Sequence, residues 1–283
     1  MQERRIGTMM VHAIGLGEMP LSVQGRPDAE QGVRTIHAAL DAGVTLIDTA
    51  DAYCLGPEEV GHGERLVARA LRARSATTEV LVATKGGHTR PSSAEWGLDG
   101  HPDYLRRAAE ASATALGVST LGLYQFHRPD PSVPYAESVG ALADLLDAGT
   151  IAMAGISNAT VAQIDEAQEV LGGRLAAVQN EFSPGFRSSL GELRHCAEHG
   201  IAFLPWSPLG GIGKAGALAT SAFAEVAEAH DATPQQVVLA WMLAQGPQVI
   251  PIPGSSRSQT IRASAAAADL VLTSAEVRRL DAA

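Results

Sequence analysis

The stretch LGLYQFHRPDPSVPYAESVGALADLLDAGTIAMAGIS, residues 121–157, carries the pattern that decides the fold. It begins and ends with a short apolar run, and an amphipathic segment, 135–148, lies between the two. Within that segment Val139, Leu142 and Leu146 recur at spacings of three and four residues, so they share one face of a helix. The two apolar runs alternate only weakly, as expected for strands buried on both faces of a parallel sheet. The stretch therefore predicts a strand, a helix and a second strand parallel to the first.

The same unit repeats along the chain. Eight apolar runs are expected to be strands: 13–17, 44–48, 79–85, 121–127, 151–157, 175–180, 201–206 and 248–254. Eight segments are expected to be helices: 30–42, 64–74, 102–116, 135–148, 161–171, 189–199, 234–244 and 258–268. Four of these helices are followed by a glycine in the position that usually ends a helix, namely Gly43, Gly117, Gly149 and Gly200.

Eight strand–helix units without a break in composition predict an α/β fold with one domain, residues 1–283, forming a single (β/α)8 TIM barrel. The tail 273–283 predicts a short extra C-terminal helix capped by Thr273 or Ser274, with Glu276 as the partner in a capping box. A doubly wound sheet with an added domain is the alternative, and it would need a domain boundary that the sequence does not offer.

Composition excludes several classes of protein. The 283 residues include 21 Lys and Arg against 31 Asp and Glu, a net charge of −10, and this acidic balance without a basic cluster argues against nucleic acid as a partner. We interpret Arg69, Arg72 and Arg74 as a solvated helix face. Two cysteines, no signal peptide and no uninterrupted apolar span indicate a cytoplasmic protein that does not enter a membrane.

Polar residues close most of the expected strands, where the working residues of a barrel lie. Lys85 is notable because 19 of the 21 cationic side chains are arginine, yet a lysine ends the third run. Asp48 ends the neighbouring run and is expected to pair with Lys85, so that both groups stay ionised. Tyr53 follows five residues after Asp48, and His127 ends the fourth run. Each has a structural explanation on its own, but together they predict a site that donates a proton.

These residues stand in segments that resemble the aldo-keto reductase family, in its bacterial branch, over nearly the whole chain. The matching segments occur in the family's order: IDTADAY (47–53), VATKGG (82–87), YQFHRPD (124–130), AGISN (154–158), VQNEFSP (178–184), LPWSPLGG (204–211) and IPGSS (252–256). The resemblance implies an NADPH-dependent oxidoreductase that reduces an aldehyde or ketone to the alcohol, without a metal. It assigns the catalytic tetrad to Asp48, Tyr53, Lys85 and His127, with Tyr53 as the general acid that Lys85 favours in its charged form.

The resemblance also implies the cofactor contacts. Ser157, Asn158 and Gln179 would hold the nicotinamide carboxamide, and Trp206 would stack on the nicotinamide ring. The pyrophosphate would lie on a loop containing Ser207, Leu209 and Gly211, and the adenosine phosphate on a loop containing Gly254, Ser255, Ser256 and Arg257. The family's adenine-binding positions are here Thr260, Ala263 and Ser264, so we expect weaker or different adenine contacts. NADPH is expected in preference to NADH, because Arg257, or less favourably Arg262, can hold a 2′-phosphate.

Two other functions are compatible with the sequence: a regulatory or redox-sensing barrel that binds NADPH with little turnover, and a barrel lyase or isomerase without a nicotinamide. The carbonyl substrate and the oligomeric state cannot be read from the sequence. His195 and His199 have the spacing of a helical zinc motif, but no third ligand is evident, so we expect no metal site.

Overall fold

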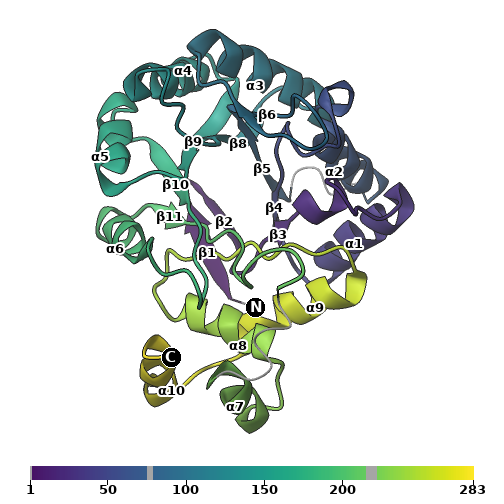
Figure 1. The fold of residues 1–283 in the computed structure, drawn as a ribbon, viewed down its shortest axis with the longest axis vertical. Coiled ribbons are helices and arrows are strands. Elements are labelled where there is room, and N and C mark those ends of the chain that lie inside the picture. Colours follow the sequence, from purple (N-terminus) through teal and green to yellow (C-terminus); the bar gives the residue numbers. More distant parts are fainter. Residues whose placement is uncertain (1, 75–78, 215–221) are drawn as a thin grey trace.

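A curled sheet of seven parallel strands occupies the middle of the computed structural model, which describes residues 2–74, 79–214 and 222–283 (Figure 1). In spatial order these strands are β11 (Ala202–Phe203), β10 (Leu175–Gln179), β9 (Ile151–Ser157), β8 (Leu121–Phe126), β5 (Leu81–Gly86), β4 (Leu46–Asp48) and β3 (Leu16–Gly17). Apart from the inserted hairpins, neighbours in space are neighbours in sequence, as in a barrel.

The run expected as the eighth strand closes this barrel without forming a regular strand. The amide of Ile250 donates to the carbonyl oxygen of Phe203 in β11, and the amide of Ile252 donates to that of Pro205, just after β11. On its other side, the carbonyls of Pro251 and Pro253 accept from the amides of Gly15 and Gly17. Proline has no N–H to donate, so the ladder on the β3 side is incomplete. The (β/α)8 barrel is confirmed, and its last strand is less regular than predicted.

Helices surround the sheet, and all eight expected helices are present with boundaries within two residues of the predicted ones. They are α1 (Ala29–Asp41), α2 (His62–Ala73), α3 (Pro102–Leu116), α4 (Tyr135–Asp147), α5 (Val161–Val170), α6 (Leu190–His199), α8 (Pro234–Leu243) and α9 (Ser258–Ala266). The tail helix α10 (Ser274–Asp281) begins with the expected capping box between Thr273 and Glu276. Helix α7 (Ala222–Ala229) is an addition that the sequence pattern did not indicate.

A hairpin of β1 (Glu3–Ile6) and β2 (Met9–His12) closes one end of the barrel and was also not predicted. Ile6 and Val11 of this hairpin belong to the apolar cluster inside the barrel, together with Leu46 and Leu81. Since Leu46 and Leu81 are the first residues of β4 and β5, the hairpin covers the amino-terminal ends of the strands. The opposite end, where the strands finish, is therefore the one left for a functional site.

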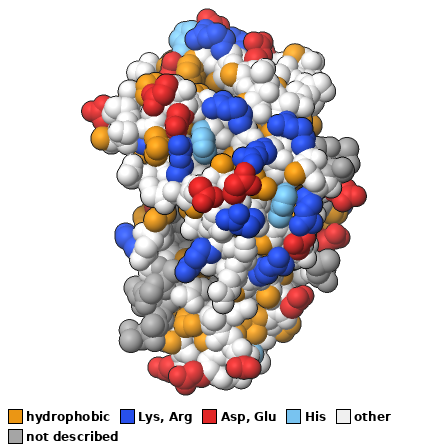
Figure 2. All heavy atoms as spheres, turned by 90° about the vertical axis from the view of Figure 1, so that its right-hand side faces the viewer, with side chains coloured by type: hydrophobic (Ala, Val, Ile, Leu, Met, Phe, Trp, Pro, Cys, Tyr) orange, Lys and Arg blue, Asp and Glu red, His pale blue; other side chains and the backbone are white. Residues whose placement is uncertain are grey.

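The face over α1 and α2 carries interspersed charges of both signs (Figure 2). Arg69 pairs with Glu30, and Arg74 pairs with Asp41 at 2.8 Å, in both cases linking α2 to α1. This mixture fits a solvated helix face and not a patch for nucleic acid. In the described part of the chain, no helix has the length and apolar character needed to cross a membrane.

Candidate active site

Four predicted residues meet at the carboxyl ends of three adjacent strands. Asp48 is the last residue of β4, Lys85 is the penultimate residue of β5, and His127 directly follows β8. Tyr53 lies on the loop that follows β4. All four side chains are buried, Lys85 completely.

Lys85 is the centre of the group. Its ammonium donates to Asp48 Oδ1, to the carbonyl oxygen of Thr49 at 2.9 Å and to the Tyr53 hydroxyl at 3.3 Å. Three donors and three acceptors satisfy the ammonium fully, which is the condition for burying a charge. Burial alone would lower the pKa of Lys85, but Asp48 and Tyr53 outweigh burial and raise that pKa above its ordinary value. Lys85 is therefore a permanent buried cation.

The Tyr53 phenol corrects one expectation. We expected the Lys85 cation to lower the pKa of Tyr53, and Lys85 does act in that direction, but burial acts more strongly and leaves the pKa above its ordinary value of 10. Tyr53 is thus a neutral phenol with its proton in place.

The His127 imidazole lies beside that phenol. The two rings meet edge to face, with centroids 5.7 Å apart. Burial lowers the pKa of His127 well below its usual range, and the nearby Lys85 cation adds to the effect. His127 is therefore neutral, and among the described residues its buried Nδ1 has no hydrogen-bond partner.

Two glutamine amides complete the shell around Asp48. Gln179, at the end of β10, donates to Asp48 Oδ2 at 2.7 Å, and Gln125 of β8 donates to the same oxygen at 3.2 Å. The sequence analysis did not single out Gln125. It stands in β8, two residues before His127, and side chains two residues apart along an extended chain point to the same face. That spacing is the sequence signal from which Gln125 could have been predicted.

The residues expected around the nicotinamide lie next to the tetrad. The Asn158 amide donates to the carbonyl oxygen of His127 and to Ser157 Oγ, both at 3.0 Å. Ser157 Oγ in turn donates to the carbonyl oxygen of Gln179 at 2.7 Å. Trp206 packs against the apolar cluster inside the barrel, and its buried Nε1 has no partner among the described residues. These residues thus form one connected rim beside the tetrad.

Two loops extend the rim toward the last strands. In the first, the amide of Gly210 donates to the carbonyl of Ser207 across a tight turn. Gly210 and Gly211 there have φ values of +87° and +102°, which a residue with a Cβ rarely adopts. In the second, Ser255 Oγ accepts from the amide of Arg257, which precedes the first turn of α9. Leu209, Gly254 and Ser256 lie within these two loops as expected.

Buried acids near the tetrad were missed by the sequence analysis. Glu18 is fully buried and accepts hydrogen bonds from Ser22 and from Thr49, and burial raises its pKa to about 8. Asp51 is buried on the same loop as Tyr53, and burial together with the nearby Glu64 raises its pKa well above the ordinary value. Single acidic residues carry no periodic signal, so the sequence alone did not mark them.

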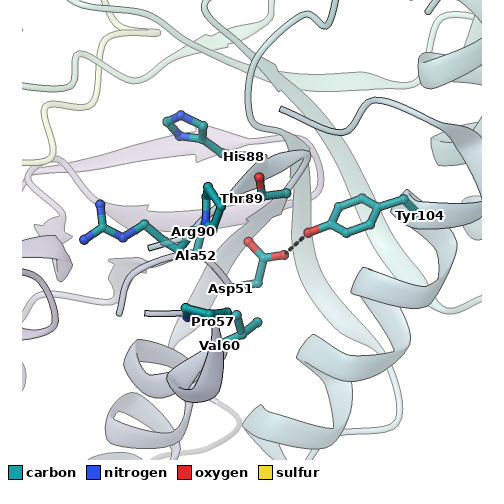
Figure 3. Close-up of a pocket in the computed structure, with 9 residues that line it drawn as sticks. Asp51, Ala52, Pro57, Val60, His88, Thr89, Arg90 and Tyr104 are labelled. Atoms are coloured by element: carbon teal, nitrogen blue, oxygen red, sulfur yellow. Dashed lines mark hydrogen bonds between the residues drawn. The ribbon is translucent and has the colours of Figure 1, made fainter. Parts of the chain in front are cut away.

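A cavity of about 280 Å³ lies next to Asp51 (Figure 3). Asp51, His88, Thr89 and Tyr104 form part of its wall, and the Tyr104 hydroxyl points to Asp51. The His88 ring contacts the ring of His127 at a centroid distance of 4.8 Å. The cavity therefore lies beside the tetrad and is separated from it by His88.

One aromatic residue on the loop after β5, Trp96, reaches the site through His88. Its ring stacks on His88 at 4.7 Å and remains partly exposed. Phe182 is instead a core residue, stacked on Trp241 at 5.5 Å and 1% exposed. Phe186 is exposed on the neighbouring loop.

Comparison with known proteins identifies the family of the chain. The profile of the Aldo/keto reductase family matches residues 13–283. The chain belongs to the aldo-keto reductase family. It is accordingly an oxidoreductase of the class that uses a nicotinamide cofactor.

Relatives of this aldo-keto reductase span bacteria and fungi. It is 35% identical to the 6-dehydroglucose reductase of Novosphingobium aromaticivorans, over 91% of this chain and 86% of the relative. It is 33% identical to an uncharacterized oxidoreductase of Schizosaccharomyces pombe, over 98% of this chain and 88% of the relative. Among solved structures, an aldo/keto reductase from Klebsiella pneumoniae in complex with NADP and acetate superposes with a TM-score of 0.81, at 28% identity, covering 99% of this chain and 94% of that one.

Proposed function

We propose that this aldo-keto reductase uses NADPH to reduce the carbonyl group of a small aldehyde or ketone to an alcohol, with Tyr53 as the general acid. The observation that carries the proposal is the buried contact of Lys85 with both Tyr53 and Asp48. A buried ammonium beside a protonated phenol is the arrangement needed to stabilise a phenolate as its proton leaves.

When bound, NADPH supplies the hydride that is added to the carbonyl carbon. Tyr53 gives its hydroxyl proton to the carbonyl oxygen and regains a proton from solvent. Lys85 stabilises the negative charge that develops on the phenol oxygen, and Asp48 keeps Lys85 charged and in place. Neutral His127 hydrogen-bonds the carbonyl oxygen and orients it toward Tyr53.

The chain's residues fit a dinucleotide at the rim. Ser157, Asn158 and Gln179 would hold the nicotinamide carboxamide, and the half-exposed Trp206 would present its ring to the nicotinamide. Ser207, Leu209 and Gly211 would contact the pyrophosphate, since the positive φ values of this turn bring backbone close to a ligand. Gly254, Ser255 and Ser256 would contact the adenosine phosphate.

Arg257 supports NADPH in preference to NADH. Within the described residues its guanidinium has no ion pair, whereas that of Arg262 pairs with Asp41 at 3.3 Å. Arg257 also precedes the first turn of α9, where backbone N–H groups favour an anion. A 2′-phosphate bound here would contact both the Arg257 guanidinium and the backbone N–H groups at the start of α9.

Steady-state oxidation of NADPH against a panel of aldehydes and ketones tests the proposal. We expect turnover by the wild type, and a fall in kcat of about 100-fold or more for Tyr53→Phe, because that variant keeps the ring and loses the proton donor. Quenching of tryptophan fluorescence by NADPH checks that Tyr53→Phe still binds the cofactor. A Tyr53→Phe variant with wild-type turnover would refute Tyr53 as the acid, and tight NADPH binding without turnover on any carbonyl would instead favour a regulatory barrel.

A further inference from the structure

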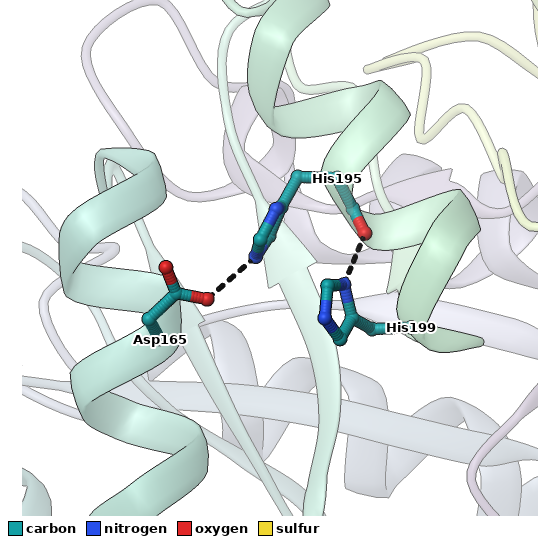
Figure 4. A group of neighbouring side chains, drawn as sticks. All are labelled: Asp165, His195 and His199. Carbon is teal, nitrogen blue, oxygen red and sulfur yellow. Dashed lines mark hydrogen bonds and ion pairs between the residues drawn. The ribbon is translucent and has the colours of Figure 1, made fainter.

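A His–His–Asp cluster lies on the outer helical layer. His195 and His199 lie on α6, and Asp165 lies on the adjacent helix α5 (Figure 4). One potential ligand atom from each of the three lies within 4.8 Å of the other two. The sequence showed only the two histidines, and the packing of α5 against α6 supplies the third group.

Hydrogen bonds already orient the two imidazoles. His195 Nε2 lies 2.7 Å from Asp165 Oδ1. His199 Nδ1 lies 2.9 Å from the carbonyl oxygen of His195 and must donate to it, because a carbonyl can only accept. The lone pair of His199 is therefore on Nε2. Metal-binding histidines are commonly held in this way, with the second ring nitrogen donating to a backbone carbonyl.

We propose that Asp165, His195 and His199 form a Zn²⁺ site that links α5 to α6, with water as the fourth ligand. Two imidazole nitrogens and one carboxylate oxygen are a ligand set that zinc accepts, at metal–ligand distances of about 2.0–2.2 Å. A tetrahedral site at those distances places its ligand atoms about 3.4 Å apart. The widest separation in the cluster, at most 4.8 Å, must therefore close by up to about 1.4 Å, and the 2.7 Å contact between His195 Nε2 and Asp165 Oδ1 must lengthen. The side chain of Asp165 is 59% exposed and can move that far without disturbing the core.

Cys196 is not part of this site although it stands between the two histidines. It is fully buried and lies in the apolar cluster between sheet and helices. Its side chain is held in that cluster, and it is not among the ligand atoms that gather at Asp165, His195 and His199. The ligand set is therefore Asp165, His195 and His199 alone.

Zinc titration of EDTA-treated full-length protein tests the proposal. Isothermal titration calorimetry with Zn²⁺ alone should show one ion per chain, and His195→Gln, His199→Gln and Asp165→Asn should each weaken binding by about tenfold or more. His230→Gln is the matched control, because His230 also pairs with a carboxylate, Glu276 at 2.8 Å, but has no second histidine beside it among the described residues. We expect its zinc affinity to equal that of the wild type.

Cobalt provides a second, spectroscopic readout. Co²⁺ should give the visible absorption of a tetrahedral site in the wild type, and the spectrum should be lost in His195→Gln/His199→Gln. Circular dichroism checks that the double variant is folded. Unchanged zinc affinity in the double variant, an equal loss in His230→Gln, or a stoichiometry above one without a tight first ion would each overturn the proposal.

Discussion

The Lys85 ammonium lies 3.3 Å from the Tyr53 hydroxyl and 5.0 Å from the centre of the tyrosine ring. The charge is therefore at the edge of the ring, beside the oxygen, where it acts on the phenol proton. The same ammonium is held by Asp48, whose second oxygen is held by Gln179 and Gln125. Four strands thus fix one cation against one phenol.

Replacing Lys85 by arginine should abolish most activity although the charge is conserved. The site accommodates a compact ammonium with three acceptors around it, and a planar guanidinium needs more space than this fully buried position offers. We expect kcat to fall by about 100-fold or more and the melting temperature to fall as well, measured by NADPH oxidation and thermal unfolding. The same exchange at exposed Lys214 is the control and should leave the melting temperature unchanged. Full activity of Lys85→Arg would contradict the role given to the ammonium.

The sequence predicted most of the fold because the barrel is built from local patterns. The helices have apolar faces that can be read from local spacing, and three of them begin with a capping box, at Thr160, Thr233 and Thr273. The β1–β2 hairpin escaped prediction because its two strands are only four residues long and their core partners are distant in sequence. The run 248–254 was predicted as a regular strand from its apolar residues. It is irregular because Pro251 and Pro253 have no N–H groups to donate to the neighbouring strand.

The proximity of Asp48, Tyr53, Lys85 and His127 was predictable for a different reason, because the ends of neighbouring strands in a barrel converge, whereas the catalytic roles of these residues stay a prediction. What the sequence could not supply is contacts across strands, such as Gln125 with Asp48, and contacts across helices, such as Asp165 with His195. The direction of the Tyr53 pKa also depends on burial, which is a property of the packed structure. These contacts arise from tertiary packing between residues that are distant in sequence, so they produce no periodic pattern in the sequence.

The pH profile of carbonyl reduction should lack a step near pH 6.5. Burial lowers the pKa of His127 well below that value, so the imidazole is neutral throughout the neutral range. Tyr53 has a raised pKa in the free enzyme, so kcat/KM should fall only in alkaline solution, as the phenol loses the proton it must donate. We would measure kcat/KM with saturating NADPH across the pH range. A step near 6.5 that disappears in His127→Gln would show that the imidazole titrates there and would contradict its neutrality.

Arg257→Ala should reduce the preference for NADPH. Hydrogen bonds to a charged group contribute about 1.5–3 kcal/mol, so losing those to the 2′-phosphate should raise the KM for NADPH by about 10–100-fold and leave the KM for NADH unchanged. Arg262→Ala is the matched control, because that guanidinium is paired with Asp41. If Arg257→Ala changed the KM for NADPH and the KM for NADH equally, Arg257 would not be the residue that binds the 2′-phosphate.

Glu18→Gln should change how stability depends on pH. Burial raises the folded-state pKa of Glu18 from about 4.5 to about 8, so the folded protein keeps this proton where the unfolded chain releases it. The stabilisation from the raised pKa is complete below pH 4.5 and is lost as pH rises through 8, a difference of at most about 5 kcal/mol. Glutamine stays neutral and can still bond both hydroxyls of Ser22 and Thr49.

The free energy of unfolding in urea, measured at several pH values between about 5 and 9, should therefore fall less steeply for Glu18→Gln than for the wild type. The stability of the variant increases relative to that of the wild type as pH rises, because the variant has no buried carboxyl group to ionise. Glu198→Gln, at an exposed position on α6, should keep the wild-type slope. Parallel curves for the wild type and Glu18→Gln would mean that Glu18 ionises as easily in the folded protein as in the unfolded chain.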